Sequence, residues 1–481
     1  MENKHSTLKA GLLIVLAVAV LAFLVGYRPA DVSRGGQREV IQVWHPWGGP
    51  MLEAYQLGVD AFEKSHPAIG CKLLYVPNDM SNSQKFYTAV IGNCAPEVTF
   101  VDGPQVAEWA HRGLLAPLDD LLREQGIDPT QFAGEFFPPC WRQSVYRGKI
   151  YGITYCADPN FCFFWNKKAI RDAVAAGEIP AGAIDVNKPP ATLEELDRYN
   201  ELVTRQRDSG AGKQLDRLGL IPWGVYGYAN SLFTWGWAFG GEFYDEERQQ
   251  VTANDPRIVQ ALEWMCKYAQ QYGFEQVTTL QSTFGSAQQN PFIVGKQVMQ
   301  LMHLSGIADL DQYAPSLEYG MAPIPGLKGG DGSASWVGGW TLSIPAGVTD
   351  PAKRRAALEF ILWSCASQEG TSMKIRTARN FPGWKKSQFF EEAQKDPRLA
   401  VFTDILKNCR HQRPVMPAQA FYMDQINRAV EKVVRTSSNP NPARRISAKT
   451  ALDEATRVTQ QRLDKLLAEK GLLAERKEPQ P

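Results

Sequence analysis

The feature that most constrains the fold is the alternation of short apolar strands with amphipathic helices over residues 40–112. Strands are predicted at residues 40–44, 69–76 and 97–101, and the segments between them have apolar residues at helical spacing. This alternation is typical of a parallel sheet with helices packed on its faces. In such sheets, ligands bind beyond the carboxyl ends of the strands. We therefore expect an α/β fold with a binding site close to the residues that follow these strands.

Length and charge narrow the class of protein further. The chain has 481 residues, and at roughly 150 residues per domain this suggests two to three domains. The net charge is +1, which argues against a nucleic-acid partner, because such proteins carry a basic patch. Only one segment is apolar enough to enter a bilayer, so a polytopic transporter is excluded. The 13 Trp, 16 Tyr and 22 Phe exceed what a core requires, and we expect some of these rings to face a ligand.

The apolar segment lies near the N-terminus and runs from Ala10 to Gly26, after Lys4 and Lys9. Its length is close to the lower limit of about 17–25 residues for a membrane-spanning helix, and it also fits the apolar region of a secretory signal. No A-x-A cleavage site follows it, and no lipoprotein cysteine stands directly after it. We expect residues 1–37 to form an uncleaved anchor and a linker, with a cleaved signal as the alternative. In either case the remaining chain is expected to be extracytoplasmic, in the periplasm.

The eight cysteines show no metal-binding spacing, because no C-x-x-C motif occurs. An even number in an exported chain permits disulfides, but we expect buried free thiols, with one or two bridges as the alternative. The six histidines are scattered, and no cofactor-binding motif is present. We therefore expect no metal and no cofactor.

Seven short motifs follow one another along the chain. They are FEKSHP at 62–67, APEV at 95–98, GLLAPLD at 113–119, GKIYGI at 148–153, FWNK at 164–167, PATLEEL at 190–196 and GGW at 338–340. In this order they resemble the motifs of the extracellular solute-binding proteins of carbohydrate ABC importers, the maltose- and glycerol-phosphate-type family. The resemblance extends over residues 40–467. The chain departs from the family in lacking a lipobox cysteine, in its eight cysteines and in a longer insert between residues 168 and 190.

The resemblance implies a two-lobed, type II periplasmic-binding-protein fold with parallel-rich sheets and flanking helices, preceded here by the N-terminal membrane segment. Lobe 1 is expected to comprise residues 38–152 and 340–405. Lobe 2 is expected to comprise residues 153–339 and 406–481. The ligand would lie between the lobes, and closure of the hinge would bury it.

The function that the resemblance implies is that of the substrate-binding component of an ABC importer. Such a protein is a monomer that binds a carbohydrate and delivers it to the permease subunits in the membrane, without catalysis. Two alternatives stay open. One is a glycoside-active enzyme, which would also use tryptophans and paired carboxylates. The other is a sugar sensor built on the same fold. The chain contains no H-E-x-x-H, G-x-S-x-G or P-loop motif.

The site residues are predicted from their positions at strand ends and in loops. A sugar presents apolar C–H faces that stack on aromatic rings, and hydroxyls that bond to carboxylates, amides and Arg. The candidates are Trp47, Asp102, Gln105, Asp158, Asn160, Asn230, Trp235, His303, Gly338, Gly339, Trp340 and Arg379. No Arg/Lys cluster of the kind a phosphate needs is apparent, so a neutral or weakly polar saccharide is expected.

Several candidates have a structural alternative. Trp235 could fill the core of lobe 2, Asp102 could cap the helix that follows it, and His303 could be a core histidine. Arg379 could pair with a surface carboxylate, and the paired glycines could mark a bulge. Four further tryptophans lie inside strands or helices and are expected in the core: Trp44, Trp165, Trp264 and Trp363.

Overall fold

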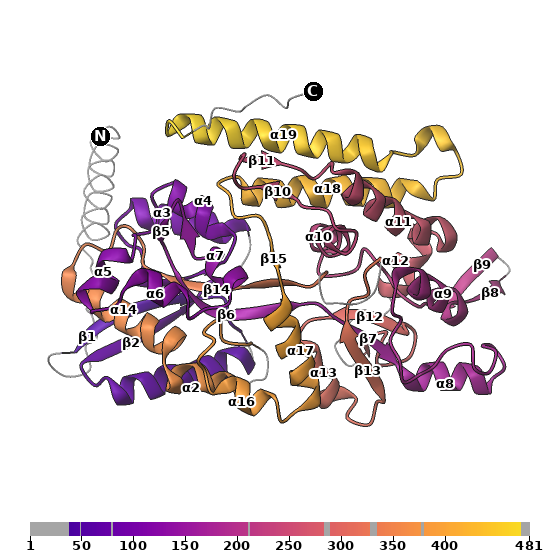
Figure 1. Cartoon of the computed structure of the whole chain (residues 1–481), viewed down its shortest axis with the longest axis horizontal. Helices are drawn as coiled ribbons and strands as arrows, with labels where there is room; N and C mark the ends of the chain where they lie inside the picture. Colours follow the sequence, from indigo (N-terminus) through magenta and orange to yellow (C-terminus); the bar gives the residue numbers. More distant parts are fainter. Residues whose placement is uncertain are drawn as a thin grey trace, which may run out of the picture.

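Two lobes lie side by side and are joined by long strands that run from one into the other (Figure 1). The structure is a computed structural model, and it describes residues 38–48, 50–77, 80–209, 212–282, 289–327, 334–376 and 380–472. Among these residues, no helix combines the length and the apolar character that a membrane crossing requires. The predicted membrane segment from Ala10 to Gly26 lies outside the described residues.

The sheet of lobe 1 contains the three strands predicted near the N-terminus. They are β1 (Glu39–His45), β2 (Ile69–Tyr75) and β3 (Val98–Asp102), and β1 pairs in parallel with both of the others. Strand β14 (Trp336–Ser343) pairs antiparallel with β3 on one side and with β6 (Ile153–Asn160) on the other. The short strand β15 (His411–Gln412) pairs in parallel with β14. The prediction of a parallel sheet is therefore confirmed for the first three strands.

Helices cover both faces of this sheet because their apolar stripes pack on its alternating side chains. The fully buried Phe62 of one helix packs with Ile41 and Val43 of β1. The helices of lobe 1 are α2 (Pro50–Ser65), α3 (Met80–Ile91), α4 (Gln105–His111), α5 (Asp119–Glu124), α6 (Pro129–Ala133), α7 (Pro138–Arg142), α14 (Pro351–Ala366), α15 (Gln368–Ser372), η2 (Met373–Arg376) and α16 (Phe389–Ala393). A small hairpin, β4 (Val145–Tyr146) with β5 (Lys149–Ile150), precedes β6.

Lobe 2 is built on a smaller sheet, and its strands are antiparallel. Strand β7 (Cys162–Asn166) lies between β12 (Met299–Met302) and β13 (Tyr319–Pro323). The expectation of parallel-rich sheets is wrong for this lobe, because both neighbours of β7 pair with it antiparallel.

The helices of lobe 2 begin at sequence signals. At the start of α9 (Leu193–Val203), the Thr192 hydroxyl accepts a hydrogen bond from the Glu195 amide, and the Glu195 carboxylate accepts one from the amide of Ala191, the residue before the cap. The remaining elements are α8 (Lys167–Ala175), α9 (Leu193–Val203), β8 (Arg205–Ser209), β9 (Gly212–Arg217), α10 (Tyr228–Ala238), β10 (Tyr244–Asp245), β11 (Gln250–Val251), α11 (Pro256–Tyr272), α12 (Phe274–Ser282), α13 (Ser305–Tyr313) and α17 (Pro397–Asn408).

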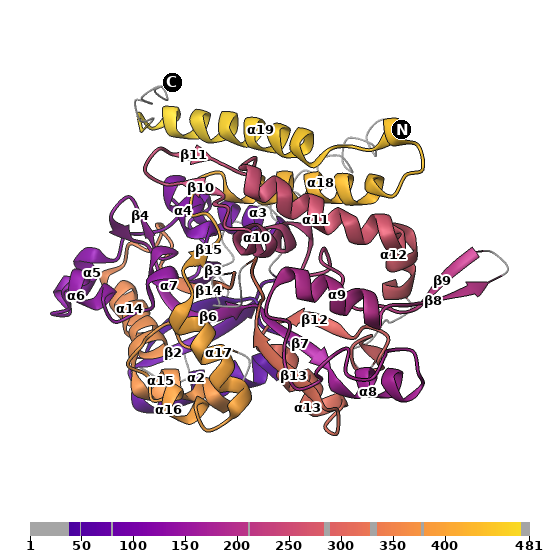
Figure 2. The same cartoon turned by 45° about the vertical axis from the view of Figure 1, so that its right-hand side comes forward.

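The C-terminal helices tie the two lobes together. Helices α18 (Gln419–Ser437) and α19 (Ala448–Glu469), joined through η3 (Pro442–Arg444), form a helical hairpin over lobe 2 (Figure 2). The far end of α19 reaches lobe 1, where Nε2 of the buried His111 lies 3.0 Å from the Leu466 carbonyl oxygen. Burial lowers the pKa of His111, so this contact is between neutral groups at physiological pH.

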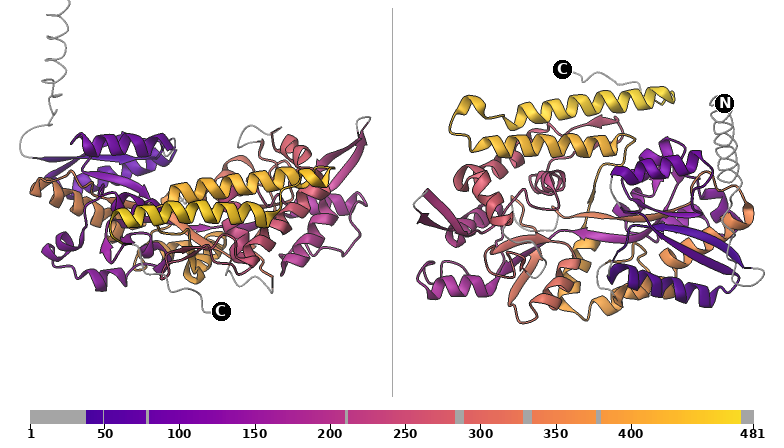
Figure 3. Two further views of the ribbon diagram at one scale, coloured as in Figure 1. Left: turned by 90° about the horizontal axis from the view of Figure 1, so that it is seen from above. Right: turned by 180° about the vertical axis from the view of Figure 1, so that it is seen from behind.

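The chain passes between the lobes in three places, as the view from behind shows (Figure 3). Strand β6 leads into β7, β14 returns to lobe 1, and the segment around β15 leads to the C-terminal hairpin. The predicted lobe boundaries fall at the start of β6, within β14 and within α17. The division of the chain at these exact residues stays a prediction.

All eight cysteines are free, and six of them are buried, as expected for structural thiols. Cys94 is exposed and Cys71 is half-buried, so these two differ from the expectation. The four tryptophans expected in the core are at most 9% exposed, which confirms that prediction.

Candidate ligand-binding cleft

A cleft of about 410 Å³ lies where β6 and β14 pass between the lobes. Its walls come from the loop after β1, the end of β3, both crossing strands and the N-terminal end of α10. Nine of the twelve residues predicted from the sequence line it: Trp47, Asp102, Asp158, Asn160, Asn230, His303, Gly338, Gly339 and Trp340. These residues were predicted from their positions at strand ends and in loops, and the fold brings them together from distant parts of the chain.

Trp235 does not reach the cleft, and its assignment as a stacking residue is corrected. Its side chain is 0% exposed, and its indole nitrogen donates a hydrogen bond of 2.8 Å to the Pro222 carbonyl. The ring packs against Trp264 in the core of lobe 2. Trp235 lies in helix α10, in which nearly every side chain is buried, and not at a strand end or in a loop.

Gln105 and Arg379 are the other two predicted residues that do not line the cleft. Gln105 is the first residue of α4. Its side chain is half-buried and does not line the cleft. Arg379 lies outside the described residues. Asp102 does not cap α4, because the cap position is Pro104 and no side chain caps this helix.

Aromatic rings form two groups in the cleft. Trp47 and Trp340 meet edge to face, with ring centroids 5.5 Å apart. On the lobe 2 side, Tyr226 stacks on Phe161 at 5.3 Å and is 54% exposed. An exposed ring held by a neighbouring ring offers a flat apolar surface to a ligand at little entropic cost. The cleft therefore presents aromatic surfaces from both lobes.

The polar groups centre on an ion pair. Arg413 Nη2 donates a hydrogen bond of 2.7 Å to Asp102 Oδ1, and both side chains are largely buried. The guanidinium also lies 5.5 Å from the centroid of the Trp336 ring. Arg413 Nε and Asn230 Oδ1 are shielded from solvent and have no hydrogen-bond partner among the described residues. A polar ligand in contact with these two atoms would therefore supply an acceptor to Arg413 Nε and a donor to Asn230 Oδ1.

Asp158 is the titratable group of the cleft. Its pKa is raised to about 7, mainly by burial and also by the nearby Asp102 charge, while Arg413 opposes this shift. Near neutral pH the Asp158 carboxyl is therefore partly protonated and can donate as well as accept a hydrogen bond.

The paired glycines are required by strand packing. Gly339 has φ of +139°, and a Cβ there would lie 2.0 Å from the Cys156 carbonyl oxygen. A Cβ on Gly338 would meet the Asn160 side chain at 2.8 Å. The register of β14 against β6 shifts directly after Trp340, so the alternative reading of these glycines as a bulge agrees with the strand geometry.

His303 lies at the lobe 2 side of the cleft. Its Nδ1 accepts a hydrogen bond of 3.0 Å from the Ser305 amide, and its Nε2 lies 3.0 Å from the Ser305 hydroxyl. The ring packs 4.6 Å from Tyr226. These contacts hold the imidazole in place beside the exposed tyrosine.

Seven further residues, which were not predicted from the sequence, line the cleft: Met51, Phe161, Tyr226, Ser305, Trp336, Asn380 and Arg413. Trp336 and Phe161 carry a usable signal, because each lies within two residues of a predicted site residue on a crossing strand. Arg413 carries none, since its partner Asp102 is 311 residues away. Among the described residues, no group of three or more His, Cys, Asp or Glu side chains could hold a metal.

Comparison with known proteins gives one family and several structural neighbours. Residues 48–364 match the family described as bacterial extracellular solute-binding proteins. A Brucella abortus protein named only as a binding protein is 23% identical over 436 residues, which cover 90% of this chain and 95% of that protein.

Two solved structures share the fold. CpMnBP1 with mannotriose bound has a TM-score of 0.72 and 23% identity, and the match covers 88% of this chain and 100% of that chain. The maltose/maltodextrin-binding domain MalE from Bdellovibrio bacteriovorus bound to maltotriose has a TM-score of 0.65 and 20% identity, over 88% of this chain and 99% of that chain. Both show that the fold is that of a two-lobed binding protein.

The raised pKa of Asp158 predicts a pH-dependent stability. The native state holds this proton up to a pH of about 7, whereas the unfolded chain releases it near 3.8, so stability falls as the pH rises from about 4 through 7. Asp158→Asn cannot ionise, so its stability should not fall over this pH range. The variant should have a Tm about 2–5 °C above that of the parent at pH 8, with little difference at pH 4. Thermal unfolding followed by circular dichroism measures both. Equal pH profiles of Tm for the parent and the variant would contradict the assignment.

Proposed function

Because the chain belongs to the bacterial extracellular solute-binding protein family, we propose that it is the extracytoplasmic substrate-binding component of an ABC importer. Its substrate is a carbohydrate that binds in the cleft between the lobes and is delivered to a membrane permease. The observation that carries this proposal is the pairing of aromatic faces from both lobes with unsatisfied polar atoms in the same cleft.

The aromatic rings suit the apolar faces of a sugar. Trp340 and Trp47 are held edge to face, so the ring of one can stack on a pyranose while the other flanks it. Tyr226 provides a second surface from lobe 2. A sugar between these surfaces contacts both lobes, and its binding energy then favours closure.

The polar atoms suit the hydroxyls of a sugar. Asp102 accepts hydrogen bonds, and Arg413, fixed by its bond to Asp102, can donate from Nε. Asn230 Oδ1 can accept a hydroxyl proton. The solved structures that share the fold hold mannotriose and maltotriose, and this supports an oligosaccharide as the substrate class.

The stacking assignment predicts which tryptophans matter for binding. Trp47→Ala and Trp340→Ala should each weaken the binding of a saccharide that the parent binds by about 1–3 kcal/mol. The matched control is Trp235→Ala, which should lower Tm, because it empties a buried site, and should leave the affinity of the folded fraction close to that of the parent.

Isothermal titration with mannotriose and maltotriose measures these affinities. Parent affinity in both folded cleft variants would contradict the stacking assignment. The titrated sugar is then analysed by chromatography, because recovery of a cleaved product would favour the glycoside-active alternative, and a binding protein returns its ligand unchanged.

We further propose that the segment from Ala10 to Gly26 anchors the protein to the membrane. Its apolar run without a cleavage motif supports this. Cells that express the full chain should retain the protein in the membrane pellet after a high-salt wash, and deletion of residues 1–37 with a cleavable signal in their place should release it. A soluble product of the full chain that begins near Asp31 would contradict anchoring.

A further inference from the structure

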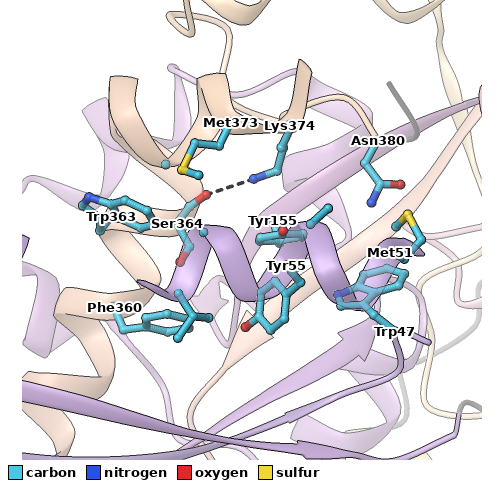
Figure 4. Close-up of a pocket in the computed structure, with 14 residues that line it drawn as sticks. Trp47, Met51, Tyr55, Tyr155, Phe360, Trp363, Ser364, Met373, Lys374 and Asn380 are labelled. Carbon is cyan, nitrogen blue, oxygen red and sulfur yellow. Dashed lines mark hydrogen bonds between the residues drawn. The ribbon is translucent and has the colours of Figure 1, made fainter. Parts of the chain in front are cut away.

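A second, smaller cavity of about 40 Å³ lies inside lobe 1, directly beside the cleft (Figure 4). We call it the Lys374 pocket. It is enclosed by α2, β6, α14 and η2. Trp47, Met51 and Asn380 line both this pocket and the cleft, so a group that projects from a ligand in the cleft can reach it.

The pocket contains a buried cation. Lys374 is only 5% exposed, and its Nζ donates a hydrogen bond of 3.1 Å to the Ser364 carbonyl. The same nitrogen lies 3.8 Å from the centroid of the Tyr155 ring. Burial lowers the pKa of Lys374 to about 8, so the amine still carries its charge on most molecules at pH 7.

Two further donors belong to residues that line the pocket and whose rings pack near Tyr155. The hydroxyl of Tyr55, a residue that is 6% exposed, and the indole N–H of Trp47 are both shielded from solvent, and neither has a hydrogen-bond partner among the described residues. Their rings lie 6.0 and 6.5 Å from the ring of Tyr155. Unsatisfied buried donors are costly, which favours an occupant that supplies acceptor oxygens.

The lining also decides the charge of that occupant. The described residues that line the pocket include one cation and no Asp or Glu, and much of the remaining wall is apolar, as at Val59 and Phe360. A desolvated ammonium gains most from an anionic oxygen at short range. The cavity has room for a group the size of a carboxylate and none for a sugar ring.

We propose that the Lys374 pocket is a subsite of the cleft that binds the carboxylate of an acidic saccharide, with the sugar ring held in the cleft beside Trp47. The proposal rests on the proposed function and narrows its substrate class from carbohydrates to saccharides of the hexuronic acid type. It differs from the expectation of a neutral saccharide, which was based on the lack of an Arg/Lys cluster in the sequence, because a single buried lysine would supply the charge.

The test compares two sugars that differ in their carboxylates, mannotriose and trimannuronate, by isothermal titration of the full chain at pH 7. The parent should bind trimannuronate about tenfold more tightly. Lys374→Met fills the same space without the charge and should abolish this preference while mannotriose affinity stays within about twofold. The matched control is Lys385→Met, at an exposed position of lobe 1, and it should preserve the preference.

A second variant guards against misfolding of the first. Tyr55→Phe removes one oxygen from the pocket and should reduce the preference for trimannuronate about threefold without lowering Tm. Equal or tighter binding of mannotriose, unchanged by these substitutions, would overturn the subsite and leave the proposed function standing. Failure of mannotriose, maltotriose and trimannuronate to bind would overturn both. If acetate raises the Tm of the parent and not of Lys374→Met, while the parent shows no preference for trimannuronate, the pocket is assigned to a free anion and the saccharide subsite is overturned.

Discussion

The pairing of strand β14 with β3 on one side and β6 on the other is the constraint on which the site depends. In this ladder Trp340 lies opposite Asp102, and Gly338 lies opposite Asp158. Residues more than 150 positions apart in the chain are thereby fixed within one strand spacing of each other. The absence of a side chain at Gly339 allows the strands to approach this closely, because a Cβ there would collide with the backbone of β6. The hinge and the binding cleft are therefore parts of one sheet, and a ligand in the cleft contacts the strands that connect the lobes.

Much of the fold could be predicted from local pattern. The strands of lobe 1, the Thr192 cap of α9 and the helix that begins after Asp255 follow from periodicity and capping residues. Helix α10 could not, because it is apolar on all sides and rich in aromatic residues, so it has no polar face that would give a helical period. Trp235 was misplaced for this reason.

The polar residues of the site could be predicted from the sequence only in part. Asp102 and Trp47 follow strands, and this local rule found them. Arg413 and Lys374 lie in segments whose positions depend on tertiary packing, and no spacing in the chain relates either of them to the cleft. If Lys374 binds a carboxylate as proposed, the absence of clustered basic residues in a sequence says little about ligand charge, since one cation removed from water interacts strongly with an anion.

The central claim is that a saccharide bound in this cleft draws the two lobes together. Small-angle X-ray scattering tests it directly, with the saccharide that binds best by calorimetry and with Trp340→Ala as the control. We predict a smaller radius of gyration for the parent with the saccharide than without it, and a smaller decrease for the variant at the same concentration, because its affinity is reduced. An unchanged radius of gyration for the parent, saturated with a saccharide whose binding is established by calorimetry, would contradict it.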